Sequence, residues 1–381
     1  MFCAFFHKKR FLYIIKDRLF IMSLNKRKFL GEDKNTNETG INFLWLFRNI
    51  SQKFQMKTEV EIMSFSILGT GRGVPAYAMT NDELSTMVDT SDEWIVQRTG
   101  IKTRHICKEE TMTEMCVKAA KEALEDAKIT ADDLDLIICA TLRGEYITPS
   151  QACVVQREIG AKCPAFDVNA ACSGFIYAFD VADGFFARNR VEKVLVIGYD
   201  NLSNIMDWTD RSTCVLFGDG GGAVVLGKGD DLLSIHITAK GNPDVLYAPR
   251  GENLSPFAKE QRKPAIFMNG HEVYKFAVTS LVKGVRKAVK DAGLTMDDVD
   301  YVIPHQANLR IIEAAADKLG IPREKYICTI GEYGNTSAGC MPIALDVARR
   351  EGKFKKGDII VFCAFGGGLT SGSCVVRWAM D

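Results

Sequence analysis

The sequence lacks several features that mark common classes of protein. It has no Cys-x-x-Cys pair, and its five histidines are scattered without a recurring ligand spacing, so no metal site is indicated. Its 48 basic and 48 acidic side chains balance, which leaves no net field to attract nucleic acid. No apolar run reaches the roughly 18 residues of a membrane span. The sequence therefore predicts a protein that needs neither nucleic acid, nor a metal, nor a membrane span.

Cysteines are plentiful, at twelve in 381 residues, but they form no regular framework. Most sit in apolar strand-like runs, as Cys139 and Cys363 do. Buried, reduced cysteines of a cytoplasmic protein have this pattern, because disulfides belong to oxidising compartments. The sequence predicts a cytoplasmic location. The same pattern indicates that most of these cysteines are core residues, so the assignment of any one of them as catalytic needs further evidence.

The first 62 residues differ from the rest. They are rich in Lys, Arg, Asn and Phe, and Lys16, Asp17 and Arg18 interrupt the second of three apolar pieces, at residues 11–15. No small-residue cleavage site follows an apolar core, which disfavours a secretory signal. A basic amphipathic surface anchor stays open as an alternative. The favoured interpretation is an N-terminal extension, 1–62, outside the fold, with the working chain beginning near Met63.

A glycine run, Gly69 to Gly73, follows a strand predicted over residues 64–68. Such runs occur at dinucleotide sites, where a helix begins beside the phosphates. Here Val74 and Pro75 follow, and no helix begins where a phosphate site needs one. A dinucleotide site is therefore disfavoured.

The chain contains an internal repeat. Residues 117–135 (VKAAKEALEDAKITADDLD) align without a gap to residues 282–300 (VKGVRKAVKDAGLTMDDVD). Each copy reads as an amphipathic helix, a Thr-x-Asp-Asp link and then a buried strand. Alternating helices and continuously apolar strands predict a parallel sheet covered on both faces. Two copies predict two similar α/β halves, 63–230 and 231–381.

Cys172 lies where a predicted strand turns into a helix, within DVNAACSGF (167–175). Backbone N–H groups at a helix start carry partial positive charge. A thiol there is expected to lose its proton more easily, and the thiolate is the nucleophile. The repeat predicts that His305 and Asn335, from the second half, converge near Cys172 if the halves pack about a pseudo-two-fold axis.

Several motifs resemble those of β-ketoacyl-acyl-carrier-protein synthase III, a family of the thiolase superfamily. They are found in order over about residues 64–380. They comprise SDEWIVQRTGI (91–101), DVNAACSGF (167–175), FGDGGGAVVL (217–226), PHQANLRI (304–311), GNTSAG (334–339) and FGGGLTSG (365–372).

The resemblance implies an α/β, thiolase-like fold. Two βαβαβαββ halves would be related by pseudo-two-fold symmetry in five layers, α-β-α-β-α. It also implies a homodimer that starts fatty-acid synthesis. An acyl-CoA primer and a malonyl-carrier protein would give a β-ketoacyl-carrier protein, CO2 and CoA. Acyl-carrier protein is then a partner, and coenzyme A enters as a substrate thioester rather than as a cofactor.

By resemblance, Cys172 takes the acyl group from the primer, which divides the reaction into two easier steps. His305 and Asn335 would hydrogen-bond the malonyl thioester oxygen and stabilise the charge left by loss of CO2. That role requires a neutral His305. The backbone N–H groups of Cys172 and Gly367 would form the second oxyanion hole.

Trp94, Arg98, Arg211 and Asn308 match residues that bind CoA in the family. Stacking on adenine and pairing with phosphates suit an aromatic ring and guanidinium groups. Each of them also has an ordinary structural explanation as a core aromatic, a solvated charge or a polar cap.

Arg310 and Lys318 match basic residues that meet the acidic carrier protein, although Asp317 departs from the family pattern there. Thr148 matches a position that reaches the partner subunit's acyl pocket. A bulky aromatic there favours acetyl primers, so threonine predicts tolerance of longer ones.

Four alternative functions compete with this interpretation, and the sequence argues against two of them. A thiolase would carry a second cysteine within the glycine-rich loop 365–369, which has none. A synthase of secondary metabolism with another acyl acceptor would keep Cys, His and Asn. A papain-like hydrolase would need a Cys-Gly-Ser-Cys-type signature, which is absent. A non-catalytic CoA-binding scaffold is the fourth.

Overall fold

The structure is a computed structural model that describes residues 6–7, 10–15, 18–23, 63–250, 256–257 and 264–381. Contacts divide the chain into two units, Met1–Glu61 and Ile62–Asp381. In the first unit, three antiparallel strands form a small sheet: β1 (Phe6–His7), β2 (Arg10–Ile15) and β3 (Arg18–Ser23). Most of segment 1–62 lies outside the described residues, so its interpretation as an extension stays a prediction.

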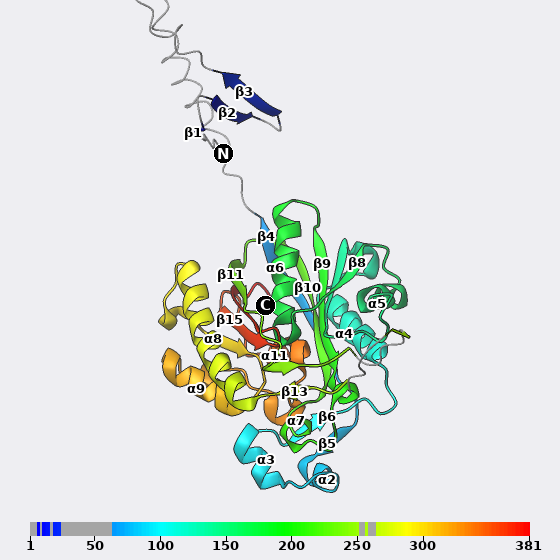
Figure 1. Ribbon diagram of the computed structural model, residues 1–381. Helices are drawn as coiled ribbons and strands as arrows, with labels where there is room; N and C mark the ends of the chain where they lie inside the picture. The colour runs from blue at the N-terminus through cyan, green and yellow to red at the C-terminus, as the bar shows by residue number, and fades with distance from the viewer. Residues whose placement is uncertain (1–5, 8–9, 16–17, 24–62, 251–255, 258–263) are drawn as a thin grey trace, which may run out of the picture. The chain divides into compact units, whose positions relative to one another are not determined.

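The second unit contains two large sheets (Figure 1). The first has five strands in the order β4-β10-β9-β7-β8. Their bounds are β4 (Ser64–Gly73), β7 (Leu136–Ala140), β8 (Ala165–Val168), β9 (Lys193–Asn201) and β10 (Asp219–Gly229). The second sheet has four, in the order β11-β16-β15-β14. Their bounds are β11 (Leu232–Ala239), β14 (Tyr301–Pro304), β15 (Ile359–Gly366) and β16 (Thr370–Arg377).

The prediction of parallel sheets was wrong in part. β7 pairs in parallel with β8 and β9, and β14 with β15, but β4, β10, β11 and β16 pair antiparallel. Parallel β7 and antiparallel β10 both contain long buried runs, so burial does not distinguish their directions. Hydrophobic pattern alone does not separate the two directions when both faces are buried.

Helices complete the layers. α4 (Met112–Asp126) and α5 (Gln151–Ile159) pack on the first sheet, and α8 (Gly270–Asp291) and α9 (Leu309–Leu319) lie on the side of the second. Two central helices, α6 (Gly174–Ala187) and α11 (Cys340–Arg350), contact strands of both sheets. The central core includes Phe65, Phe175, Phe179 and Phe362, all fully buried. The layers therefore follow the predicted α-β-α-β-α order (Figure 1).

The predicted repeat is visible in local geometry. Thr130 and Thr295 begin equivalent one-turn 3-10 helices with the same capping box. Lys128 and Gly293, at equivalent positions before these turns, both have positive φ, 56° and 73°. The two sheets also share strand order, since β4-β10-β9-β7 corresponds to β11-β16-β15-β14. The two halves thus share four strands in the same order. The prediction of a βαβαβαββ pattern in both halves was wrong in one respect, because the second sheet has an isolated Val302–Tyr326 bridge where the first has β8.

The glycine run has a packing role. The sequence predicted a strand that ends at Leu68. In the structure, β4 continues through Gly69, Gly71 and Gly73. A Cβ atom at Gly69 would lie 2.4 Å from the Ala123 carbonyl oxygen, and one at Gly71 would lie 2.4 Å from that of Ala119. Only glycine lets α4 lie this close to the strand.

Shorter elements cover the end of the sheets where β7 and β14 finish. They are β5 (Ala78–Thr80), α2 (Asn81–Ser85), α3 (Asp92–Thr99), β6 (Thr103–His105), α7 (Arg211–Cys214), β12 (Leu246–Tyr247), β13 (Phe267–Met268) and α10 (Ile330–Tyr333). Fully buried Arg104 ties them together, because its guanidinium donates to the Asn81 side chain and to the Met79 and Val215 carbonyls. Among the described residues, no helix is long and apolar enough to cross a bilayer.

Candidate active site

Cys172 lies in the predicted strand-to-helix turn. β8 ends at Val168, a 3-10 turn spans Ala171–Ser173, and α6 begins at Gly174. Ala171 has a φ of 49°, in the left-handed region that a residue with a side chain seldom adopts. The Asn169 side-chain oxygen supports this geometry by accepting a hydrogen bond from the Ala171 N–H at 3.2 Å. The sharp turn places the cysteine at the start of the helix.

The same turn occurs in the second half, before α11. Ser337 has a φ of 53°, and its N–H donates to the Asn335 side-chain oxygen at 2.9 Å. Because that oxygen accepts from the backbone, the opposite end of the amide is the NH2 group. No described residue accepts a hydrogen bond from this NH2 group. Asn335 therefore presents two free donors.

His305 directly follows β14, and only 1% of its surface is exposed. Its backbone N–H donates to the Cys363 carbonyl, and its ring meets that of Phe365 edge-on, with centroids 5.2 Å apart. Burial lowers the pKa of His305 to about 3. The imidazole is thus neutral at physiological pH, as the predicted role requires.

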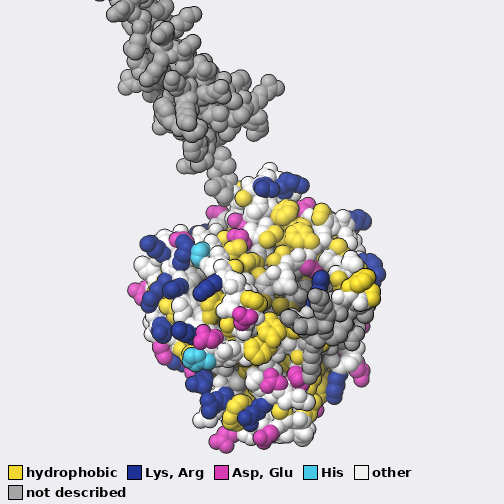
Figure 2. Space-filling view, in the orientation of Figure 1, with side chains coloured by type: hydrophobic (Ala, Val, Ile, Leu, Met, Phe, Trp, Pro, Cys, Tyr) yellow, Lys and Arg dark blue, Asp and Glu magenta, His cyan; other side chains and the backbone are white. Residues whose placement is uncertain are grey.

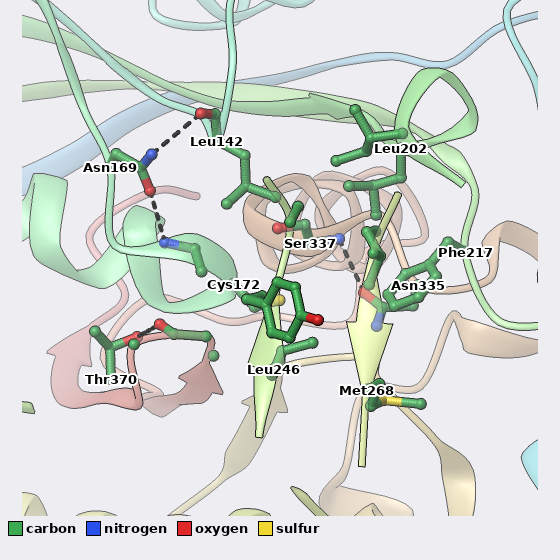
Figure 3. Close-up of a pocket in the computed structure, with 18 of the residues that line it drawn as sticks. Leu142, Asn169, Cys172, Leu202, Phe217, Leu246, Met268, Asn335, Ser337 and Thr370 are labelled. Carbon is green, nitrogen blue, oxygen red and sulfur yellow. Dashed lines mark hydrogen bonds between the residues drawn. The ribbon is translucent and has the colours of Figure 1, made fainter. Parts of the chain in front are cut away.

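One cavity of about 900 Å³ is lined by Cys172, His305 and Asn335 together. The convergence expected from the repeat is therefore present. Figure 3 shows Cys172, Ser337 and Asn335 around the same space, with Leu246 and Met268 of the small β12–β13 sheet beside it. The cavity combines a thiol, an imidazole and an amide with a largely apolar lining, which suits a hydrophobic acyl group.

The glycine-rich loop closes against the cysteine turn. A Cβ atom at Gly366 would lie 2.7 Å from the Cys172 backbone nitrogen. The Thr370 hydroxyl is 2.9 Å from the Ala170 carbonyl oxygen and 3.0 Å from that of Gly367 (Figure 3). Gly367 also lines the cavity. The turn and the loop are thus held side by side, with the two backbone segments predicted for the oxyanion hole next to each other.

The expected ease of deprotonation of Cys172 was wrong for the free protein. Burial, with a smaller contribution from the Asp200 carboxylate, raises the pKa of the thiol to about 12. Ser337 lies beside both groups and lowers the pKa of each. Asp200 is itself buried, with a pKa raised to about 6, and accepts from the Thr141 hydroxyl and the Leu142 N–H. Desolvation outweighs the helix N-terminus here.

Comparison with known proteins agrees with this geometry. The family model described as 3-oxoacyl-[acyl-carrier-protein] synthase III matches residues 166–241, and its C-terminal counterpart matches residues 289–378. The β-ketoacyl-[acyl-carrier-protein] synthase III of Clostridium acetobutylicum is 47% identical over 83% of this chain and 99% of its own length. That of Aquifex aeolicus is 49% identical over 83% of this chain and all of its own. The chain belongs to the β-ketoacyl-acyl-carrier-protein synthase III family.

Solved structures support the same assignment. The crystal structure of the Aquifex aeolicus VF5 synthase III has a TM-score of 0.78, with 48% identity, and covers 82% of this chain and 100% of that one. The priming β-ketosynthase of the R1128 polyketide pathway has a similar TM-score, 0.79, at a lower identity of 32%, and covers 83% of this chain and 96% of that one. The predicted thiolase-like fold and condensing activity are confirmed, and the alternative of secondary metabolism is not favoured.

The residues that resemble the family's CoA site lie together. The Arg211 guanidinium is over the Trp94 ring, 5.1 Å from its centroid, and that of Arg98 is 6.0 Å away. Asn308, at the start of α9, donates to the Arg98 carbonyl and also lines the cavity. A cationic and aromatic surface therefore adjoins the cavity through Asn308.

The remaining predicted residues lie outside the cavity. Arg310 and Lys318 are exposed on α9, while Asp317 between them pairs with Arg323 at 2.9 Å. Thr148 is exposed and does not line the cavity of its own chain, although the adjacent Ile147 does.

Several residues of the site were missed from the sequence. Ser337 and Asp200 flank the thiol, and Cys340 contacts His305. Ser337 lies inside the GNTSAG motif, and Asp200 lies near the end of an apolar strand. These positions in the sequence could have indicated that both residues are close to the site. Cys340 carried none, because it reads like the other core cysteines.

Acid should weaken the fold through His305. The unfolded chain protonates this residue near pH 6.5, whereas the folded state resists protonation down to about pH 3. The free energy of unfolding should therefore fall by about 2 kcal/mol between pH 6.5 and pH 4.5. Urea unfolding at pH 6.5 and 4.5, at one protein concentration, would measure this. The His305→Gln variant should lose that part of the pH dependence. An equal change in the free energy of unfolding between the two pH values in both proteins would show that His305 is not the group responsible.

Gly366 should not tolerate alanine. Gly366→Ala forces a Cβ atom to 2.7 Å from the Cys172 nitrogen, so the nucleophile turn or the loop must shift. We expect kcat/KM to fall about 10²-fold or more, the size of a lost oxyanion donor. Gly184→Ala in α6 is the control, because its Cβ would meet nothing within 4 Å and Gly184 does not line the cavity. Similar losses in both variants would disprove close packing at Gly366.

Proposed function

We propose that this chain joins an acyl-CoA primer to malonyl-acyl-carrier protein, with Cys172 as nucleophile. One observation carries the proposal: Cys172, His305 and Asn335 line a single cavity. The Cys172 sulfur attacks the primer thioester carbonyl, and CoA leaves as its thiol with the proton from Cys172. The acyl-enzyme then holds the primer as a thioester. The backbone N–H groups of Cys172 and Gly367 stabilise the oxyanion formed at that carbonyl.

The second step uses the donors of the second half. Loss of CO2 from the malonyl group leaves an enolate whose oxygen accepts hydrogen bonds from His305 and Asn335. The enolate carbon attacks the acyl carbonyl, a C–C bond forms, and the Cys172 thiolate leaves and takes a proton from solvent. These groups supply the whole reaction, so we propose that no metal or other cofactor takes part. Activity should survive dialysis against a chelator.

Intact-mass analysis tests the first step. The protein is mixed with a panel of acyl-CoAs, and each adduct is located by peptide mapping. An acyl group on Cys172 is the expected result, and its absence would favour a CoA-binding scaffold. Malonyl-carrier protein and malonyl-CoA are then added to separate samples of the acyl-enzyme. The adduct should be released much faster by malonyl-carrier protein than by malonyl-CoA. Equal rates would indicate an acceptor other than a carrier protein.

We propose that the exposed basic face of α8 and α9 meets the acidic carrier protein. Figure 2 shows Lys and Arg side chains gathered over these helices, on the left of the view. Arg310 and Lys318 belong to α9, and Lys283, Arg286 and Lys290 to α8, all of them exposed. The five positive charges on these two helices favour an acidic partner.

We propose a cytoplasmic homodimer. The described cysteines are all free, as in a reducing compartment. The loop beside the cavity exposes Tyr146 at 55% and Ile147 at 84%, an unusual exposure for large apolar side chains. Contact with a second copy would cover them. Light scattering at micromolar concentration should report twice the chain mass, and a monomeric mass would contradict the proposal.

Primer range is predicted from Thr148, which in this arrangement reaches the cavity of the partner subunit. Threonine leaves more space than an aromatic residue, so butyryl-CoA and isobutyryl-CoA should acylate Cys172 at least as fast as acetyl-CoA. Thr148→Phe should slow the two larger primers and spare acetyl-CoA. A strict acetyl preference in the natural sequence would contradict this assignment.

A further inference from the structure

Cys340, the first residue of α11, contacts the ring of His305. Its sulfur lies 2.9 Å from His305 Nδ1 and 3.3 Å from the backbone nitrogen of Gln306. All three residues are at most 2% exposed, so water does not compete for these groups. The contact is therefore between a buried thiol and one nitrogen of a buried imidazole.

The direction of the Cys340–His305 hydrogen bond follows from the chemistry of the groups. The Gln306 N–H can only donate, so the Cys340 sulfur already accepts one hydrogen bond. Burial raises the pKa of Cys340 and lowers that of His305, so both are neutral. Sulfur is a weak acceptor, whereas the bare nitrogen of a neutral imidazole is a good one. Among the described residues, only His305 Nδ1 is in place to accept the thiol proton.

We propose that Cys340 is a positioning residue: its S–H donates to His305 Nδ1 and thereby holds the ring proton on Nε2. This proposal rests on the proposed function. Nε2 lies on the opposite side of the ring, His305 lines the cavity, and no described residue hydrogen-bonds Nε2. The Nε2–H is then aimed at the malonyl thioester oxygen before substrate arrives. A partner that fixes one ring nitrogen fixes the tautomer at the other.

The proposal separates the two half-reactions. Acylation of Cys172 does not use the His305 proton, whereas decarboxylation does. Cys340→Ala removes the donor to Nδ1, so the proton can move to that nitrogen and the cavity loses its N–H. We expect decarboxylation of malonyl-carrier protein to fall about tenfold, below the 10²–10³ of a fully lost donor. The rate of Cys172 acylation by labelled acyl-CoA should stay within twofold.

Cys340→Ser and Cys374→Ala are the controls. Serine keeps an O–H donor to Nδ1, so decarboxylation should be restored to near the level of the natural sequence. Cys374 is a fully buried thiol in β16 that does not line the cavity, and its alanine variant should leave the ratio of the two rates unchanged. Equal loss of both half-reactions in Cys340→Ala would mean a merely structural role and would overturn the proposal.

The tautomer can also be observed directly in the natural sequence, without any variant. With 15N-labelled histidine, the His305 ring should show a protonated Nε2 and a bare Nδ1, and Cys340→Ala should show a mixture. A protonated Nδ1 in the natural sequence would overturn the proposal even if catalysis is normal. If the natural enzyme neither acylates Cys172 nor decarboxylates malonyl-carrier protein, the proposed function fails instead, and the tautomer result stands separately.

Discussion

The Cys172→Ala variant is expected to lose condensation activity by a factor on the order of 10⁴ or more, because the acyl-enzyme cannot form. Decarboxylation of malonyl-carrier protein should persist, since His305 and Asn335 remain in the cavity. Release of CO2 without formation of a β-ketoacyl product is therefore the expected signature. Radiolabelled malonyl-carrier protein measures both quantities in one assay.

Two further variants sharpen that test. Cys172→Ser keeps the size of the side chain but replaces the thiol with a far less nucleophilic hydroxyl, so a slow acyl adduct should form. Cys153→Ala removes a thiol in α5 that does not line the cavity, and it should leave adduct formation unchanged. An acyl adduct of normal yield in Cys172→Ala would assign the nucleophile to another residue.

The Asn335→Asp variant is expected to reduce condensation by about 10²–10³-fold while acylation of Cys172 continues. Aspartate can still accept the hydrogen bond from the Ser337 N–H, so the turn before α11 is kept. Its second oxygen then faces the cavity as an acceptor, where the enolate oxygen needs a donor. Single-turnover measurements of acylation and of decarboxylation separate the two effects.

The matched control for Asn335 is the equivalent residue of the first half. Asn169 makes the same turn, but its NH2 group donates to the Leu142 carbonyl at 3.1 Å. Asn169→Asp should therefore disturb local structure without removing a donor to substrate, and decarboxylation should fall far less. If the two variants lose decarboxylation equally, Asn335 acts through the fold rather than on the substrate.

The sequence predicted the site better than it predicted the sheets. The repeat placed Cys172, His305 and Asn335 at corresponding ends of two similar halves, and such ends meet when the halves pack together. Strand direction was less accessible, because β10 and β16 are buried on both faces and look like their parallel neighbours.

The pKa of Cys172 could not be predicted from its position at a helix start. Solvent exclusion depends on residues far apart in the chain, such as Asp200 and the loop around Gly366. The role of Cys340 was hidden for the same reason, since only the folded arrangement brings its sulfur to His305. Long-range burial, rather than local pattern, sets the chemistry of these groups.

The duplicated turn gives the fold two equivalent positions for a reactive side chain, of which only one carries a thiol. Ala338 in the second half occupies the place of Cys172, and the amide of Asn169 is tied to the backbone where that of Asn335 is free. In the proposed reaction, one half supplies the attacking sulfur and the other the donors, so the site needs both halves. The difference between the two turns therefore gives a symmetric fold an asymmetric site, with the thiol on one side and the amide donors on the other.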